Sequence, residues 1–190
     1  MLLEFRRIND AVWERYRQGL ISQPSLARER FRQLLIHLGS DPREAEALGL
    51  SYLDHLASRG ELLPGCRRVL VSLGRRYRLG IVTNGIDRVQ RSRLRVSGLE
   101  RHFSVIVTSQ GCGFAKPDPR IFRTALSVLG LGPRQVLYVG DDAVVDRAAA
   151  VGAGIPFVWI DRGVPLARGV RRPRRRVASL VELARTLQSI

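Results

Sequence analysis

The chain has 190 residues, of which 45% are hydrophobic and 26% are charged. This globular composition argues against a disordered or fibrous chain, and the length suits one domain of roughly 100–200 residues with a small insert. Basic residues outnumber acidic ones, 32 against 17, for a formal net charge of +15. No apolar run approaches the roughly 20 residues of a membrane span, so we expect no membrane partner.

The first part of the chain predicts helices. Apolar residues recur at helical spacing between Ile8 and His55. Residues 40–42, Ser-Asp-Pro, combine a capping side chain with a proline suited to a first helical turn, so another helix is expected to begin there. Leu-Pro-Gly at 63–65 interrupts this pattern, and residues 66–77 predict one more helix. We therefore expect residues 1–60 to form a helical domain.

The pattern changes after residue 78, where short apolar runs alternate with helical stretches. The predicted strands are 79–82, 103–107, 136–139 and 156–160, and the predicted helices are 87–96, 118–129, 143–151 and 180–187. Continuous β-branched runs separated by helices are typical of a parallel sheet that is covered on both faces. Residues 61–190 therefore predict an α/β core with a doubly wound parallel sheet.

Polar residues follow three of the predicted strands. They are Thr83, Asn84 and Gly85, then Lys116, and then Asp141, Asp142 and Asp146. In an open parallel sheet, functional groups gather beyond the carboxyl ends of the strands. Hydroxyl, amide and ammonium groups can bind phosphoryl oxygens, and carboxylates can hold Mg²⁺ or orient its waters. Each motif alone also fits a plain turn or helix cap, but their order on successive strands favours a site for a phosphate and a divalent metal.

Lys116 is the single lysine among the 32 basic residues. The excess of arginine is most simply a coding bias, so it is weak evidence for a nucleic-acid partner. The densest part, residues 168–176, is typical of a solvated loop, although binding of RNA or DNA by this run stays an alternative. An ammonium is a compact point charge, so a position that stays lysine in such a chain indicates a tight site.

Three motifs resemble those of the haloacid dehalogenase-like (HAD) hydrolase superfamily. Residues 81–85 are similar to its motif II, residues 115–122 to motif III, and residues 139–142 with Asp146 to motif IV. The helical N-terminal part resembles the small α-helical cap of the family, which would precede a Rossmann-like core. The segment around Trp13 is similar to the pyrimidine 5′-nucleotidase-like branch.

This resemblance implies a Mg²⁺-dependent phosphatase, in which an aspartate attacks phosphorus and water releases the aspartyl-phosphate. By position, Thr83, Asn84 and Gly85 would bind phosphate, and Lys116 would steady the nucleophile and the phosphoryl group. Asp141, Asp142 and Asp146 would serve the metal. The branch implies a small phosphorylated substrate, with a nucleoside monophosphate as the best choice. Because only two cysteines occur, a cytoplasmic location is expected.

The chain departs from the family at motif I, the strand ending in Asp-x-Asp that supplies the nucleophile. No Asp-x-Asp occurs in these residues. In the family this strand is the centre of the sheet, between the strands that end here at Asn84 and Gly140. Its loss would leave backbone groups of both neighbours without hydrogen bonds, and each unpaired group costs about 1–3 kcal/mol of stability. Either Met1 is internal to a longer chain, or this is a truncated or inactive relative. The residues as printed are expected not to hydrolyse by the family mechanism.

Overall fold

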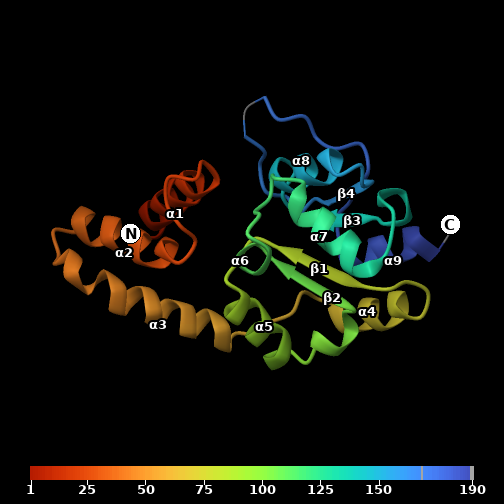
Figure 1. Ribbon diagram of the computed structural model, residues 1–190, viewed down its shortest axis with the longest axis horizontal. Helices are drawn as coiled ribbons and strands as arrows, with labels where there is room; N and C mark the ends of the chain where they lie inside the picture. The colour runs from red at the N-terminus through yellow and green to blue at the C-terminus, as the bar shows by residue number, and fades with distance from the viewer. Residues whose placement is uncertain (168, 189–190) are drawn as a thin grey trace. The chain divides into compact units, whose positions relative to one another are not determined.

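The structure is a computed structural model that describes residues 1–167 and 169–188, and the chain divides into two compact units. Unit 1 comprises Met1–Gly60 and Ile86–Val96, and unit 2 comprises Glu61–Gly85 and Ser97–Ile190. The element labels below are those of Figure 1. No described helix has the length and apolar character needed to span a membrane.

Unit 1 consists of helices. They are α1 (Leu2–Arg17), α2 (Ser25–His37), the short 3-10 helix η1 (Pro42–Glu44), α3 (Ala45–Ser58) and α5 (Asp87–Val96). The helix start predicted at residues 40–42 is confirmed, because Asp41 accepts a hydrogen bond from the Arg43 amide at the beginning of η1. Ile8, Val12 and Leu26 form a buried cluster between α1 and α2. The helix α5 joins this unit through α3, where Arg88 and Asp54 form an ion pair of 2.8 Å.

A second cluster in unit 1 is aromatic and adjoins a buried arginine. The rings of Phe5, Phe31 and Tyr52 have centroids 5.5–6.2 Å apart, and the guanidinium carbon of Arg30 lies 5.0 Å from the centroid of Tyr52. Arg30 is only 5% exposed. A cation–π contact returns about 0.5–2 kcal/mol, whereas removing an ion from water costs several kcal/mol. The contact with Tyr52 by itself therefore does not offset the cost of burying the Arg30 charge.

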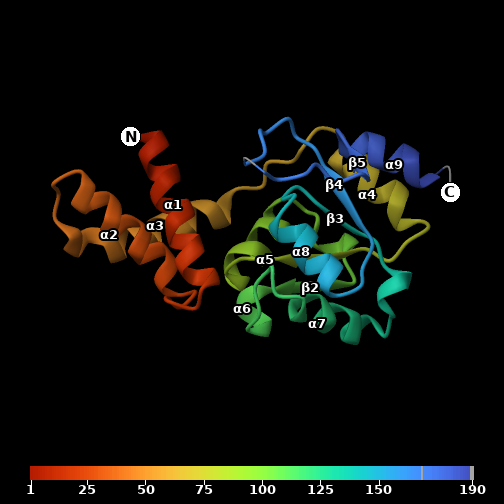
Figure 2. The same cartoon turned by 90° about the horizontal axis from the view of Figure 1, so that it is seen from above.

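Unit 2 alternates strands and helices. In chain order its main elements are α4 (Cys66–Gly74), β1 (Gly80–Thr83), β2 (Val105–Thr108), α6 (Ser109–Cys112), α7 (Arg120–Leu129), β3 (Tyr138–Gly140), α8 (Val145–Gly152), β4 (Phe157–Ile160), β5 (Arg176–Val177) and α9 (Leu180–Gln188). Two further 3-10 turns are η2 (Glu100–His102) and η3 (Pro133–Gln135). Every strand pair is parallel, with Gly80 opposite Val105 and Tyr138 opposite Phe157. The predicted α/β fold class is confirmed (Figure 2).

The described strands form two sheets, β1–β2 and β3–β4–β5, rather than one. The strands β2 and β4 bury Val105, Val107, Phe157 and Trp159, whereas every residue of β3 is only half-buried and β1 has no buried residue. In a continuous covered sheet the burial would be greatest at the centre. Among the described strands β1 and β3 therefore each pair with one neighbour, and a missing strand between them stays a prediction.

The main core of unit 2 packs α7 and α8 against β2 and β4. Ile121, Ala149 and Ala150 are fully buried there, and Trp159 is 2% exposed. The Trp159 indole donates a hydrogen bond of 3.0 Å to the carbonyl of Asp141, so the core also positions the loop that follows β3.

One strand lies where the sequence analysis expects a solvated loop. β5 begins at Arg176, at the end of the arginine run 168–176, of which Arg168 lies outside the described residues. Arg176 is exposed and Val177 is 5% exposed, so the strand alternates as expected for an edge. Two residues are too few to show that alternation in the sequence.

Unit 1 offers a test of its electrostatics at Glu29 on α2. Its carboxylate accepts hydrogen bonds from Arg32 and Arg15 at 2.8 Å and from Gln33 at 3.0 Å. The Arg32 guanidinium, helped by Gln33 and Arg15, lowers the pKa of Glu29 from 4.5 to about 2 against the opposing effect of burial.

We predict that Glu29→Gln lowers the free energy of unfolding at pH 7 and that this loss disappears on acidification. A carboxyl group whose pKa is lowered by folding stabilises above its unfolded pKa and ceases to do so as pH falls to its folded pKa. Urea unfolding followed by circular dichroism should therefore show the two proteins converging between pH 4.5 and about 2. A difference that stays constant over that range would contradict the assignment.

Candidate active site

The seven predicted residues all lie in unit 2, around the carboxyl ends of β1 and β3. Thr83 is the last residue of β1, and Asn84 and Gly85 follow it. Asp141 and Asp142 follow β3, and Asp146 is in the first turn of α8. Lys116 comes from the loop between α6 and α7. Whether these residues act on a substrate stays a prediction, and the structure describes how they are held.

Lys116 is 8% exposed, and its ammonium makes three short contacts. Nζ donates to Asp146 Oδ1 at 2.6 Å, to the Tyr138 hydroxyl at 2.9 Å and to the Val82 carbonyl at 3.3 Å. These three acceptors use the full donor capacity of an ammonium. The broad guanidinium of arginine would not fit this arrangement, which explains a lysine in a chain that otherwise uses arginine.

The backbone of Lys116 is fixed by Asn84. The Asn84 amide donates to the Lys116 carbonyl at 2.8 Å, and the Lys116 amide donates back to Asn84 Oδ1 at 2.7 Å. The Gly85 amide donates to Ser109 Oγ at 3.0 Å, and Ser109 is 1% exposed. Asn84 therefore ties the end of β1 to the lysine loop, and a further role toward phosphate stays a prediction. Thr83, whose hydroxyl has no hydrogen bond among the described residues, is the better-placed donor for a ligand.

Tyr138 is the functional candidate that the sequence analysis missed. Its hydroxyl lies 3.2 Å from Asp146 Oδ1 and 3.4 Å from the Val82 carbonyl, and its ring packs edge-on against Phe122. Burial, together with the charge of Asp146, raises the pKa of the Tyr138 hydroxyl, so it stays a neutral donor. In the sequence Tyr138 is one residue of an apolar strand, and the pattern does not indicate that its hydroxyl reaches Lys116.

The three aspartates have different environments. Asp146 is 4% exposed and uses both oxygens, since Oδ2 also accepts the Asp142 amide at 3.1 Å. Asp142 Oδ1 accepts the amides of Val144 and Val145 at 2.9 and 2.8 Å and so caps α8. Asp141 is exposed, with Arg162 at 3.3 Å.

Gly140 is required by this arrangement. A Cβ at this position would collide with the Asp146 carboxylate, because β3 passes directly against that side chain. The glycine of the Gly-Asp-Asp motif therefore allows Asp146 to reach Lys116.

The described residues contain no group of three or more His, Cys, Asp or Glu side chains that could hold a metal. Of the three aspartates expected to serve Mg²⁺, Asp141 and Asp142 are exposed, although Asp141 pairs with Arg162 and Asp142 Oδ1 caps α8, whereas Asp146 is buried. Mg²⁺ in phosphate sites takes one or two carboxylates together with substrate oxygens and water. The described residues therefore offer the carboxylates of Asp141 and Asp142 as ligands and do not make a complete magnesium site by themselves.

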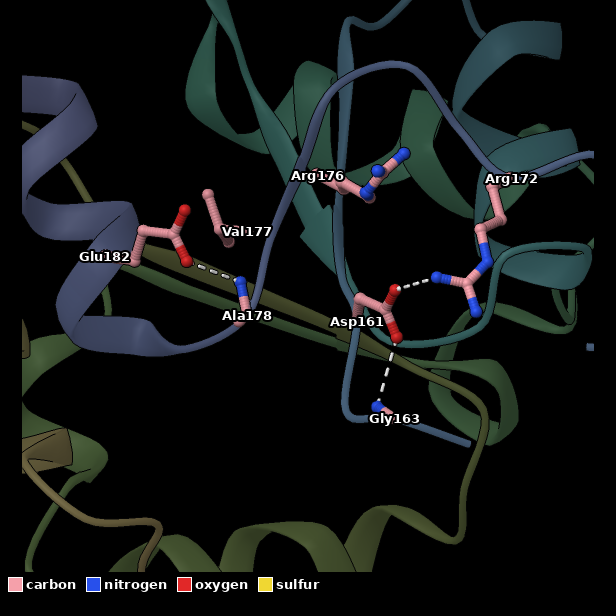
Figure 3. A pocket seen from close by; sticks show the side chains of 7 residues that line it. All are labelled: Asp161, Gly163, Arg172, Arg176, Val177, Ala178 and Glu182. Carbon is pink, nitrogen blue, oxygen red and sulfur yellow. Dashed lines mark hydrogen bonds and ion pairs between the residues drawn. The ribbon is translucent and has the colours of Figure 1, made fainter. Parts of the chain in front are cut away.

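A pocket of about 310 Å³ lies elsewhere in unit 2, beyond β4 and β5 (Figure 3). Its lining residues are Asp161, Gly163, Arg172, Arg176, Val177, Ala178 and Glu182. Asp161 pairs with Arg172 at 3.1 Å, and Glu182 accepts the Ala178 amide at 2.7 Å. None of the seven predicted site residues lines this pocket, so we place the candidate active site at Lys116.

Comparison with known proteins gives matches over most of the chain. A family model described as "Haloacid dehalogenase-like hydrolase" matches residues 27–160. A phosphoserine phosphatase of Thermus thermophilus is 35% identical over 92% of this chain and 72% of its own length. The pyrimidine 5′-nucleotidase YjjG of Escherichia coli is 31% identical over 83% of this chain and 69% of its own length.

The structure also resembles solved structures. That of the putative HAD-hydrolase YfnB from Bacillus subtilis, described as bound to magnesium, superposes with a TM-score of 0.88 at 26% identity. The match covers 99% of this chain and 82% of that one. The sequence relatives and this structural neighbour therefore agree on one family.

We predict that Asp146→Asn destabilises the protein by about 3–5 kcal/mol, because it leaves the Lys116 charge buried without a counter-ion. Asp118→Asn is the matched control, since Asp118 also forms a 2.6 Å ion pair, but with the exposed Arg120 and while itself only half-buried. Its loss should be about 0–1 kcal/mol. Urea unfolding at pH 7 measures both variants, and equal losses would show that the buried pair has no special role.

Proposed function

The chain belongs to the haloacid dehalogenase-like hydrolase family, and from that premise we propose that its substrate is a small phosphate monoester. The observation that carries the proposal is the Lys116 ammonium, which is held by Asp146, Tyr138 and the carbonyl of Val82, the residue before Thr83 on β1. The ammonium, whose three donors are already used, would act on a phosphoryl group through its charge, and the Thr83 hydroxyl would supply the hydrogen bond.

A nucleoside monophosphate is the proposed substrate, supported by the likeness to a pyrimidine 5′-nucleotidase. Phosphoserine is the second candidate, because the phosphoserine phosphatase relative matches a larger share of this chain at higher identity. The proposed partner is thus a small phosphorylated molecule, and no nucleic-acid partner is invoked. Cys66 and Cys112 are free thiols, which supports the cytoplasm as the proposed location.

The proposed reaction proceeds through an aspartyl-phosphate. A carboxylate oxygen attacks phosphorus, the ester P–O bond breaks and the alcohol leaves, and water then hydrolyses the acyl phosphate. Lys116 would neutralise charge on the phosphoryl group, Thr83 would donate to one of its oxygens, and Asn84 would hold the lysine loop in place. A magnesium ion is included because a solved relative is described as bound to it and Asp141 offers one open carboxylate.

The nucleophile is not evident among the described residues. Asp146 touches Lys116, but it is only 4% exposed, and its two oxygens already accept hydrogen bonds from Lys116, Tyr138 and the Asp142 amide. We therefore propose that an Asp-x-Asp strand seated between β1 and β3 supplies the nucleophile. An inactive relative that retains only a phosphate-binding crevice is the alternative.

The test is phosphate release by the 190-residue chain with and without an added strand. The substrates are CMP, UMP, phosphoserine and p-nitrophenyl phosphate, with Mg²⁺ present. The added strand is a Val- and Ile-rich peptide of roughly ten residues that ends in Asp-x-Asp. We expect no turnover by the chain alone, turnover with the peptide, and none with a peptide ending in Asn-x-Asp.

In the complemented protein, Lys116→Arg should lower turnover by roughly 100-fold or more although the charge is kept, because a guanidinium cannot reproduce the three contacts of Nζ. Phosphate release by the chain alone would place the nucleophile within the 190 residues. A peptide that raises the melting temperature without producing turnover on any of the four esters would contradict the phosphatase proposal and favour the inactive relative.

A further inference from the structure

The helical unit contains a buried arginine that the proposed reaction does not use. Arg30 lies on α2 among the buried positions Leu26, Ala27 and Leu35 and is 5% exposed. Its neighbours on the same helix, Arg28 and Arg32, are exposed. A general excess of arginine therefore does not explain why this one is inside.

Arg30 has no counter-ion among the described residues. Its Nε is fully buried without a hydrogen-bond acceptor, and no described carboxylate forms an ion pair with its guanidinium. The acidic residue next to it, Glu29, is directed elsewhere, because successive helical residues point about 100° apart and Glu29 is already bound by Arg32 and Arg15.

The Arg30 guanidinium contacts the Tyr52 ring, and its central carbon lies 5.0 Å from the ring centroid. That ring is also held by Phe5 and Phe31, so an apolar side chain of similar size would pack beside it without burying a charge. Burial lowers the pKa of Arg30, yet a guanidinium stays protonated at neutral pH. Packing alone therefore does not account for a cation at this position.

We propose that Arg30 is an anion-binding residue, and that a small ligand carrying a carboxylate or a phosphate places two of its oxygens on this guanidinium between α2 and α3. The planar fork of arginine matches two such oxygens, and the Tyr52 ring lies beside it, with its centroid 5.0 Å from the guanidinium carbon. The terminal nitrogens also lack a partner among the described residues but are not fully buried, so they are the atoms that a ligand meets. This site does not depend on the reaction proposed at Lys116.

The direct test is an NMR titration of the whole chain labelled with ¹⁵N-arginine. The Nε–H resonance of Arg30 is assigned as the one that disappears in Arg30→Lys. Sodium phosphate and sodium acetate are titrated separately at constant ionic strength, so the two arms distinguish phosphate from carboxylate. We expect a saturable shift of this resonance with at least one of them. Because the resonance reports on Arg30 alone, an anion bound at Lys116 cannot imitate the result, and no shift with either anion would overturn the proposal.

Arg30→Met, with Arg28→Met on the exposed face of the same helix as control, provides the second measurement. Without added anion, Arg30→Met should raise the melting temperature, because an uncompensated buried charge is removed. The apparent Kd for the anion that shifted the Arg30 resonance, measured from the rise in melting temperature, should increase at least roughly tenfold in Arg30→Met. Arg28→Met should behave like the parent protein. A lower melting temperature for Arg30→Met, or an unchanged response to the anion, would show that Arg30 is a structural residue.

Discussion

The Lys116 ammonium connects two sheets that share no backbone hydrogen bond among the described residues. It donates to the Val82 carbonyl on β1 and, on the other side, to Tyr138 on β3 and Asp146 on α8. Hydrogen bonds to a charged group contribute about 1.5–3 kcal/mol each, so these contacts replace part of what a strand-to-strand ladder would provide. Three other candidate residues and Gly140 are tied to this cluster. Asn84 holds the lysine loop, Gly140 makes room for Asp146, and Asp146 in turn receives the amide of Asp142.

The open edges of β1 and β3 couple stability to the proposed chemistry. Unpaired edge strands favour pairing with any extended segment, and each backbone hydrogen bond that is gained contributes about 0.5–1.5 kcal/mol. A strand seated there would lie beside Lys116 and Thr83, where the proposed reaction needs its carboxylate. Completion of the sheet and completion of the site would then be the same event, which is why melting temperature and turnover are informative together.

Two of the basic residues are buried in the described part of the chain, and their surroundings differ. Lys116 has a carboxylate at 2.6 Å and two further acceptors, whereas Arg30 has only an aromatic ring. Because the interior is a poor solvent for charge, a buried cation is stable only when it is paired. Lys116 meets that condition within the protein. Arg30 does not, and this contrast is what indicates a ligand at Arg30. The remaining positive charge, including the exposed arginines around β5, is solvated and needs no such explanation.

The sequence by itself determined the class of the fold and the order of its elements. Helix 87–96 and the strands near 80, 106 and 158 follow from periodicity, because the spacing of apolar residues records which face of an element is buried. The motifs after the strands also identified the family. Only the tertiary structure decided the partners of the polar groups: Asn84 on the Lys116 backbone, Tyr138 on Nζ, Asp142 as a helix cap and Arg30 without a carboxylate. These contacts join residues far apart in the chain or depend on local geometry, and their hydrogen-bond directions exist only once the strands and helices have packed.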